Sequence, residues 1–305
     1  MKLVFMGTPA FAATCLEAVL ETEHEVLGVY TKPDTPKNRG MKMIPSEVKL
    51  LAQAHGLPVY QPTSFREEEA YETLKALAPD LIVVVAYGKI LPQRILDIPP
   101  LGCINIHGSI LPALRGSAPV QWAVLNDLPE TGVTAMYLNA GMDEGDMIDV
   151  RTTPIGESET AGELMDRLAV LGAELLRDTL GAIAAGTASR TPQDPALASY
   201  APMLTKELSP IAWTHPAKKI LAQIRGLNPW PAATASLGGT EFKIWEARPV
   251  ESGADAVPGT PLALTKQGLI VACADGAILI TKLQAPGGKA MSAADYFRGH
   301  PIQLS

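Results

Sequence analysis

The first part of the chain alternates short apolar runs with segments of helical periodicity. Residues 2–6, 26–30 and 81–86 are almost entirely apolar, which is typical of strands that are covered on both faces. Between the first two runs, apolar residues from Phe11 to Leu20 recur at helical spacing. A strand–helix–strand order of this kind predicts a parallel sheet with right-handed crossover connections.

The same pattern continues over the next hundred residues. It predicts helices over residues 46–55, 67–78, 92–98, 119–126 and 160–185, and strands over residues 58–60, 103–106, 131–138 and 147–154. The last two strands are separated by a Gly- and Asp-rich turn, which favours a hairpin. We therefore predict an α/β fold with a doubly wound, mostly parallel, Rossmann-like sheet.

The pattern changes after residue 186. Residues 187–202 hold three prolines and little apolar periodicity, as expected of a linker. Beyond them, a short helix over 218–224 is followed by short strands over 242–246, 268–274 and 277–283, which predict a small β-barrel of OB-like type. The predicted division is a first domain over 1–189, a linker over 190–206 and a β-barrel domain over 207–305.

One segment interrupts the first domain. The connection over residues 31–44 is longer than those that usually join such elements, which favours a functional loop. Residues 32–49 carry five positive and two negative charges, although the chain as a whole has a net charge of −7. Lys37, Arg39 and Lys42 suit an RNA backbone as a partner. The alternative is an ordinary solvated surface loop.

The composition limits the class of protein and the compartment in which it works. Hydrophobic residues make up 47% of the chain and charged residues 19%, enough for packed cores. Three distant cysteines lack metal-ligand spacing and predict buried thiols in a reducing cytoplasm, without a metal. The apolar start is interrupted at residues 7–9, too early for a signal peptide, and no apolar run reaches the ~20 residues that span a bilayer. We expect a cytoplasmic monomer without a membrane partner.

The candidate chemistry lies at the end of the 103–106 strand. Asn105 and His107 are two residues apart, so both side chains point to one face, where open α/β sheets place their ligands. An Asn amide can stabilise an oxyanion, and a His can exchange a proton near pH 7. The pair suits attack on a carbonyl carbon, whereas the alternative is a structural core histidine. Asp143 or Asp146, in the turn between the predicted strands 131–138 and 147–154, would orient the ring.

Two common classes of cofactor are disfavoured because their binding motifs are missing from the sequence. The first strand is followed by Gly7-Thr8-Pro9 and not by a G-x-G-x-x-G motif, and the chain contains no Walker A motif. The sequence therefore argues against a dinucleotide or a nucleoside triphosphate as the ligand of the sheet.

Several motifs resemble those of the methionyl-tRNA formyltransferase family, a branch of the folate-dependent formyltransferases, over nearly the whole chain. They lie at residues 5–9, 31–45, 84–88, 105–109, 111–112, 115–116, 131–134, 142–146, 228–231 and 289–292. The Asn-x-His pair with an Asp is shared by all folate-dependent members. The basic loop and the last two motifs point to the tRNA branch.

The resemblance implies transfer of a formyl group from 10-formyltetrahydrofolate, the co-substrate, to the amino group of methionine on initiator tRNA. It implies catalytic roles for Asn105, His107 and Asp143, a folate site at Ser109, Ile110, Leu111 and Pro112, and tRNA contacts from Lys37, Arg39, Lys42 and the second domain. No metal is implied.

The chain departs from the family pattern at a few places. Ala113 and Leu114 stand where a basic and an aromatic residue are common, Met41 stands where a further cation is common, and the chain ends at Ser305, short of a usual extension. Two rival functions stay open at this point: a formyltransferase acting on a small amine such as an amino sugar, and an RNA-binding protein on an inactive scaffold.

Overall fold

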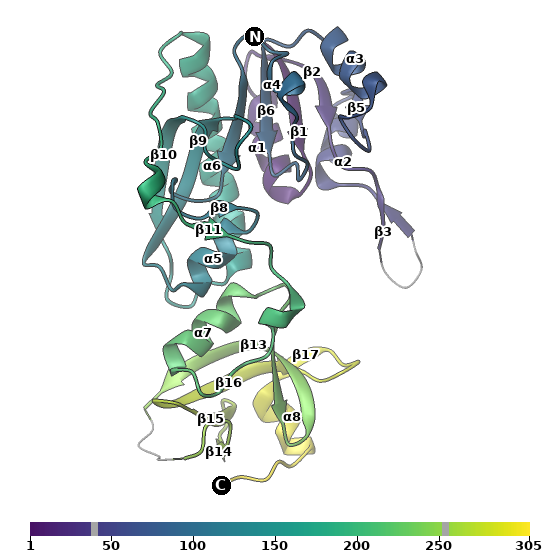
Figure 1. The fold of residues 1–305 in the computed structure, drawn as a ribbon. Helices are drawn as coiled ribbons and strands as arrows, with labels where there is room; N and C mark the ends of the chain where they lie inside the picture. The colour runs from purple at the N-terminus through teal and green to yellow at the C-terminus, as the bar shows by residue number, and fades with distance from the viewer. Residues whose placement is uncertain (38–41, 252–255) are drawn as a thin grey trace. The chain divides into compact units, whose positions relative to one another are not determined.

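The chain forms two compact units, shown in Figure 1. A computed structural model describes residues 1–37, 42–251 and 256–305. The first unit comprises Met1–Pro119, Thr131–Thr153 and Met165–Ala201, and the second comprises Val120–Glu130, Pro154–Leu164 and Pro202–Ser305. Within the described ranges, no helix has the length and apolar character needed to cross a membrane.

The first unit is built on a seven-stranded sheet in the order β10-β9-β7-β6-β1-β2-β5. The strands are β1 (Lys2–Gly7), β2 (Glu25–Tyr30), β5 (Val59–Tyr60), β6 (Leu81–Val85), β7 (Cys103–His107), β9 (Glu130–Tyr137) and β10 (Met147–Pro154). The first five are parallel, and β9 pairs antiparallel with β7. The predicted mostly parallel sheet is confirmed, and the two predicted hairpin strands lie side by side at its edge.

Helices cover both faces of this sheet. On one face α1 (Ala10–Leu20) buries the apolar side predicted for it, and α6 (Ala161–Ala184) packs closely, because a Cβ on its Gly172 would lie 3.1 Å from Ile106. On the other face α3 (Glu68–Ala76) and α4 (Gln93–Leu96) share a core cluster with Ile82, Val84 and Cys103. Strand alternation places Asn105 and His107 on the same face as Cys103.

The order of the strands creates a switch point between β1 and β6, because successive strands are added outward in both directions from there. The loops that follow these two strands are joined, since the Thr8 hydroxyl donates to the Tyr87 carbonyl at 3.1 Å. Strand β7 lies beside β6, so His107 at its carboxyl end is next to this switch point. The fold thus places the polar pair where a doubly wound sheet binds its ligands.

The segment predicted as a long loop contains short paired strands. β3 (Thr35–Lys37) and β4 (Lys42–Ile44) pair antiparallel, with Lys37 opposite Lys42, and the hairpin projects from the first unit in Figure 1. Its sequence has no apolar alternation and contains Pro36, so no pattern indicated strands. Local hydrogen bonding forms the hairpin without a buried face.

The second unit is built on a six-stranded antiparallel sheet, in the order β12-β13-β16-β15-β14 with β17 on β16. Its elements are α5 (Pro119–Leu125, except its first residue), α7 (Ala217–Gly226), β12 (Ala233–Leu237), β13 (Thr240–Val250), β14 (Pro261–Leu264), β15 (Leu269–Cys273), β16 (Gly276–Gln284), β17 (Ala290–Ser292) and α8 (Ala293–Gly299). The predicted β-rich domain is confirmed. Strands β12, β14 and β17 and helix α8 escaped prediction, since β12 is largely small residues and the other three are short.

The segment predicted as a linker is held against the first unit. Strand β11 (Tyr200–Ala201) pairs with β8 (Arg115–Gly116), directly after the stretch that carries His107. The Ser199 hydroxyl also accepts a hydrogen bond from the Leu114 backbone N–H at 2.9 Å. These contacts are polar, so an apolar pattern could not have indicated them.

Two glycines of the second unit allow a test of how closely its strands approach. Gly268 and Gly276 have φ of +155° and +152°, but a Cβ on Gly268 would lie 1.9 Å from the Ile280 carbonyl oxygen, whereas a Cβ on Gly276 would meet nothing within 4 Å. Both alanine variants should lose about 1–3 kcal/mol from backbone strain. Gly268→Ala should lose about 1–3 kcal/mol more, because the sheet must shift. Urea unfolding of the two variants compares them, and equal midpoints would contradict this close approach.

Candidate functional site

Strand β7 holds the polar pair rigidly. Asn105 is 9% and His107 5% exposed, although both are polar. Asn105 is paired with Val84 of β6 on one side and with Met136 of β9 on the other, and His107 is paired with Thr134. Pairing on both sides fixes the backbone from which the two side chains project, and burial restricts their movement.

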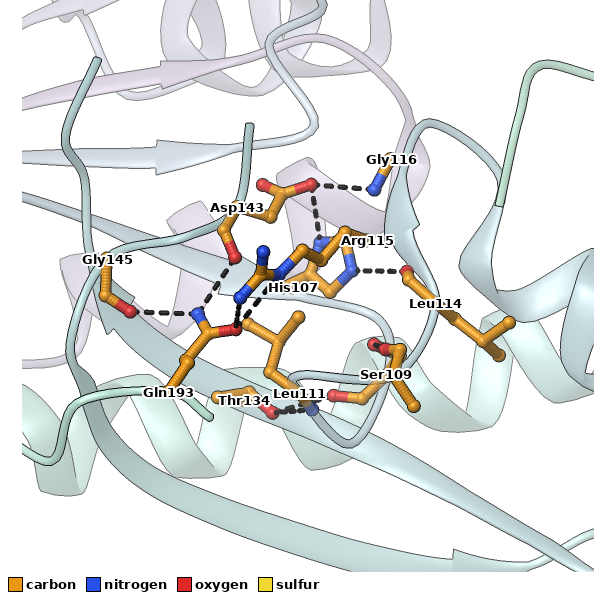
Figure 2. Close-up of polar contacts among 11 residues, drawn as sticks. His107, Ser109, Leu111, Leu114, Arg115, Gly116, Thr134, Asp143, Gly145 and Gln193 are labelled. Carbon is orange, nitrogen blue, oxygen red and sulfur yellow. Dashed lines mark hydrogen bonds and ion pairs between the residues drawn. The ribbon is translucent and has the colours of Figure 1, made fainter. Parts of the chain in front are cut away.

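The His107 ring lies between two oxygen atoms. Its Nε2 is 3.0 Å from the Leu114 carbonyl oxygen, and its Nδ1 is 3.7 Å from Oδ2 of Asp143 (Figure 2). A carbonyl oxygen can only accept, so Nε2 donates the proton of that bond. When Nδ1 takes up a second proton, that N–H faces a carboxylate. The surroundings therefore accommodate a ring that gains and returns a proton.

The carboxylate beside this ring belongs to Asp143 and not to Asp146. Oδ2 of Asp143 accepts a hydrogen bond from the Gly116 backbone N–H at 2.8 Å, and its backbone has φ of +53°. Asp146 instead lies 3.8 Å from a guanidinium nitrogen of Arg190. Of the two aspartates left open by the sequence, only Asp143 reaches His107 among the described ion pairs.

The Thr134 hydroxyl bridges two backbone groups of the turn after His107. Thr134 Oγ1 donates to the Ser109 carbonyl at 2.7 Å and accepts from the Leu111 backbone N–H at 3.1 Å. The side chains of Ser109 and Leu111 are buried, whereas Ile110 and Pro112 are half-buried. The latter two and the turn's backbone are therefore the parts of the predicted folate segment that can face a ligand.

The sequence analysis gave no role at this site to two residues that the structure brings to it, although Arg115 lies in one of the motifs. Arg115 is 4% exposed, and its Nε and a terminal nitrogen donate to Oε1 of Gln193 at 3.1 and 2.8 Å. Gln193 Nε2 donates in turn to the carbonyls of Asp143 and Gly145, each at 2.8 Å (Figure 2). Gln193 lies in the predicted linker, where nothing in the sequence marked it.

Covalent catalysis by the nearby thiol is disfavoured. Burial, with a smaller contribution from Asp97, raises the pKa of Cys103 to about 12, so the thiol stays protonated at neutral pH. Across the described ranges, no group of three or more His, Cys, Asp or Glu side chains is arranged to hold a metal ion.

Two of the predicted tRNA contacts belong to the β3–β4 hairpin. Lys37 of β3 is paired in register with Lys42 of β4, and Arg39 lies outside the described residues. The base of the hairpin is held by Lys49, whose Nζ lies 2.7 Å from Oδ2 of Asp34 and 2.8 Å from Oε1 of Gln61. Hydrogen bonds from Lys49 and Gln61 hold the pKa of Asp34 below its usual range, so this acid stays ionised.

Comparison with known families identifies both parts of the chain. The model of the formyl transferase family matches residues 1–180, and that of the formyl transferase C-terminal domain matches residues 203–301. The chain belongs to the formyl transferase family. Asn105 and His107 of β7, and Asp143 beside the His107 ring, all lie within the matched formyl transferase domain.

Similar members of the formyl transferase family share one name. The chain is 46% identical over 303 residues to the methionyl-tRNA formyltransferase of Trichlorobacter lovleyi, covering 99% of this chain and 95% of the relative. It is 48% identical over 301 residues to that of Pelobacter propionicus, covering 99% of this chain and 94% of the relative. The similarity therefore extends through both units.

Solved structures of lower identity share the fold. An N-formyltransferase from Helicobacter canadensis, in complex with folinic acid and dTDP-3-aminofucose, matches with a TM-score of 0.69 at 22% identity, over 92% of this chain and 98% of that one. HypX from Aquifex aeolicus, in complex with tetrahydrofolic acid, matches with a TM-score of 0.67 at 19% identity; this chain spans 48% of its length.

We expect the His107→Ala variant to remain folded and to lose formyl transfer. The ring contributes one backbone contact to folding, whereas loss of a proton-exchanging group typically costs about 10²–10⁴ in rate. Turnover and thermal melting of the variant are measured together. A collapse of the melting transition would instead identify His107 as a structural core residue.

The two aspartates of the 141–146 turn provide a matched comparison. Asp143→Asn should lower the turnover number about 10²-fold or more, because the carboxylate beside Nδ1 of His107 is lost. Asp146→Asn removes an equal charge three residues away, beside Arg190, and should leave turnover within about twofold of wild type. Steady-state kinetics of both variants decide, and the reverse order would assign the role to Asp146.

Proposed function

We propose that this chain transfers the formyl group of 10-formyltetrahydrofolate to the amino group of methionine on initiator tRNA, and so serves translation initiation. The observation that carries the proposal is the buried Asn105–His107 pair with the Asp143 carboxylate at its side. It is supported by relatives named for this reaction that are 46–48% identical over almost their whole length. The enzyme works in the cytoplasm as a monomer.

The proposed reaction is direct attack of the amine on the formyl carbon. A new bond forms between that carbon and the methionine nitrogen, and the formyl oxygen gains negative charge. Amide N–H groups of Asn105 donate to this oxygen, and His107 gains a positive charge that stabilises it when Nδ1 takes the proton of the attacking amine. The bond from the formyl carbon to the folate nitrogen then breaks, and the proton lost by the amine ends on that nitrogen.

His107 and Asp143 carry the proton between the two nitrogens. The Leu114 carbonyl holds one ring nitrogen, so the other is left to exchange a proton beside the Asp143 carboxylate. No covalent enzyme intermediate is needed, in keeping with the protonated Cys103 thiol. The turn formed by Ser109, Ile110, Leu111 and Pro112 lines the folate side of the site.

The projecting hairpin is proposed to select the tRNA. It carries Lys37 and Lys42 on paired strands, with Arg39 between them in sequence, and Lys49 anchors its base. Cationic side chains on an anchored, projecting hairpin suit the phosphates of an acceptor stem. From residue 206 onward the chain holds ten Lys or Arg and seven Asp or Glu, and this second domain would contact the same tRNA.

The deciding experiment measures formyl transfer from 10-formyltetrahydrofolate to two acceptors, methionyl initiator tRNA and an amino-sugar nucleotide. The proposal expects rapid transfer to the tRNA and little to the sugar. Transfer to the sugar alone would make the chain a small-amine formyltransferase. Binding of tRNA without any transfer would make it an RNA-binding protein.

Substitutions in the basic hairpin should weaken the use of methionyl-tRNA and leave the binding of folate unchanged. Arg39→Ala removes one cation that is proposed to contact phosphate, so kcat/KM for methionyl-tRNA should fall about tenfold and depend less steeply on salt. Folate affinity should stay nearly unchanged. Equal losses for both substrates would refute the role given to the hairpin, and Arg66→Ala, which removes an exposed arginine of the first unit outside the hairpin, serves as a matched control.

A further inference from the structure

The side chain of Gln193 uses its whole hydrogen-bonding capacity beside the site. Its two N–H groups donate to the carbonyls of Asp143 and Gly145, and its oxygen accepts twice from Arg115 (Figure 2). We infer that Gln193 is a positioning residue for the formyl transfer proposed above, which acts by holding the turn that carries Asp143. The inference rests on that proposed function for its activity assay.

The chemistry of its neighbours fixes which way this amide points. A flipped amide would place its oxygen against two carbonyl oxygens and its NH2 group against the guanidinium of Arg115, which has only donors. Glutamine is thus suited to its place by two properties at once. It offers two donors to the turn and an uncharged acceptor to a buried cation.

The turn needs such support because its backbone is strained. Asp143 has φ of +53°, a left-handed conformation that residues other than glycine adopt only when their surroundings demand it. Gly145 lies so close to the Tyr137 carbonyl oxygen that a Cβ would stand 1.8 Å from it. Without the two bonds from Gln193, the carbonyls of Asp143 and Gly145 lose a shared donor that fixes their relative orientation.

The same amide also ties this turn to the segment that holds His107. Leu114 contacts the ring through its carbonyl, Arg115 donates to Gln193, and the Gly116 N–H donates to Asp143. These three successive residues form one side of the site, and the 143–145 turn forms the other. Gln193 joins them, so the distance between the Asp143 carboxylate and the His107 ring depends on it.

The first test removes only the two N–H donors of the Gln193 side chain. Gln193→Glu keeps a partner for the Arg115 guanidinium, which protects folding, but turns a carboxylate oxygen toward the carbonyls of Asp143 and Gly145. The turnover number should fall at least about tenfold, because small misplacements of reacting groups cost this much or more. The KM for 10-formyltetrahydrofolate should stay within about twofold. Gln53→Glu, the same substitution at an exposed helical position, is the control and should change neither value.

The second test asks whether Gln193 acts through Asp143. In an Asp143→Asn background, Gln193→Glu and Gln193→Ala should cause little further loss of turnover. Crystal structures of the variants should show the His107–Asp143 separation lengthened and the bond from His107 to Leu114 retained. Equal losses in both backgrounds, or an unchanged separation, would overturn the inference.

The two proposals can fail separately. The single and double variants are compared with whichever acceptor the wild-type enzyme formylates. A failure to use methionyl-tRNA therefore rejects the proposed function, while the role of Gln193 is still decided. The structural measurement needs no acceptor at all. A variant that melts well below wild type, with its kinetic losses equal in both backgrounds, would show a merely structural role.

Discussion

The site depends on one constraint, the placement of an imidazole between a carbonyl and a carboxylate. Leu114 occupies Nε2 of His107 and thereby leaves Nδ1 to face Asp143. A ring held at one nitrogen presents the other for proton exchange, which is the role proposed for His107. Hydrogen bonds from Gly116 and Gln193 to Asp143, and the bond from the Leu114 N–H to Ser199, keep the two flanking residues in place.

This placement costs conformational energy, which neighbouring contacts offset. Leu114 and Asp143 both have positive φ, at about 1–3 kcal/mol each. Against this stand the hydrogen bonds that Gly116 and Gln193 donate and the one that Ser199 accepts, each contributing about 0.5–1.5 kcal/mol. The two contributions are similar in size, so the strained geometry persists only while the network is complete.

The buried guanidinium explains why that network tolerates little change. Arg115 is almost fully buried, and removing the partner of a buried charge costs about 3–5 kcal/mol. Its partners are Gln193 and, at 3.6 Å, the half-exposed Glu144. The turn with Asp143 is therefore connected through Gln193 to a buried cation, which links its geometry to local stability.

The sequence by itself determined the parts that follow from short-range patterns. Apolar runs and helical spacing located the parallel sheet, and strand alternation placed Asn105 and His107 on one face at the end of β7, because side-chain direction in a strand depends only on neighbouring residues. Residue patterns left Asp143 and Asp146 alike in a turn and only the family resemblance favoured Asp143, whereas the tertiary structure places the Asp143 carboxylate beside the ring. It also brought Gln193, 50 residues after Asp143, into the site. That contact is made by hydrogen bonds between segments that β10 and α6 separate in the sequence, and such bonds leave no periodic trace.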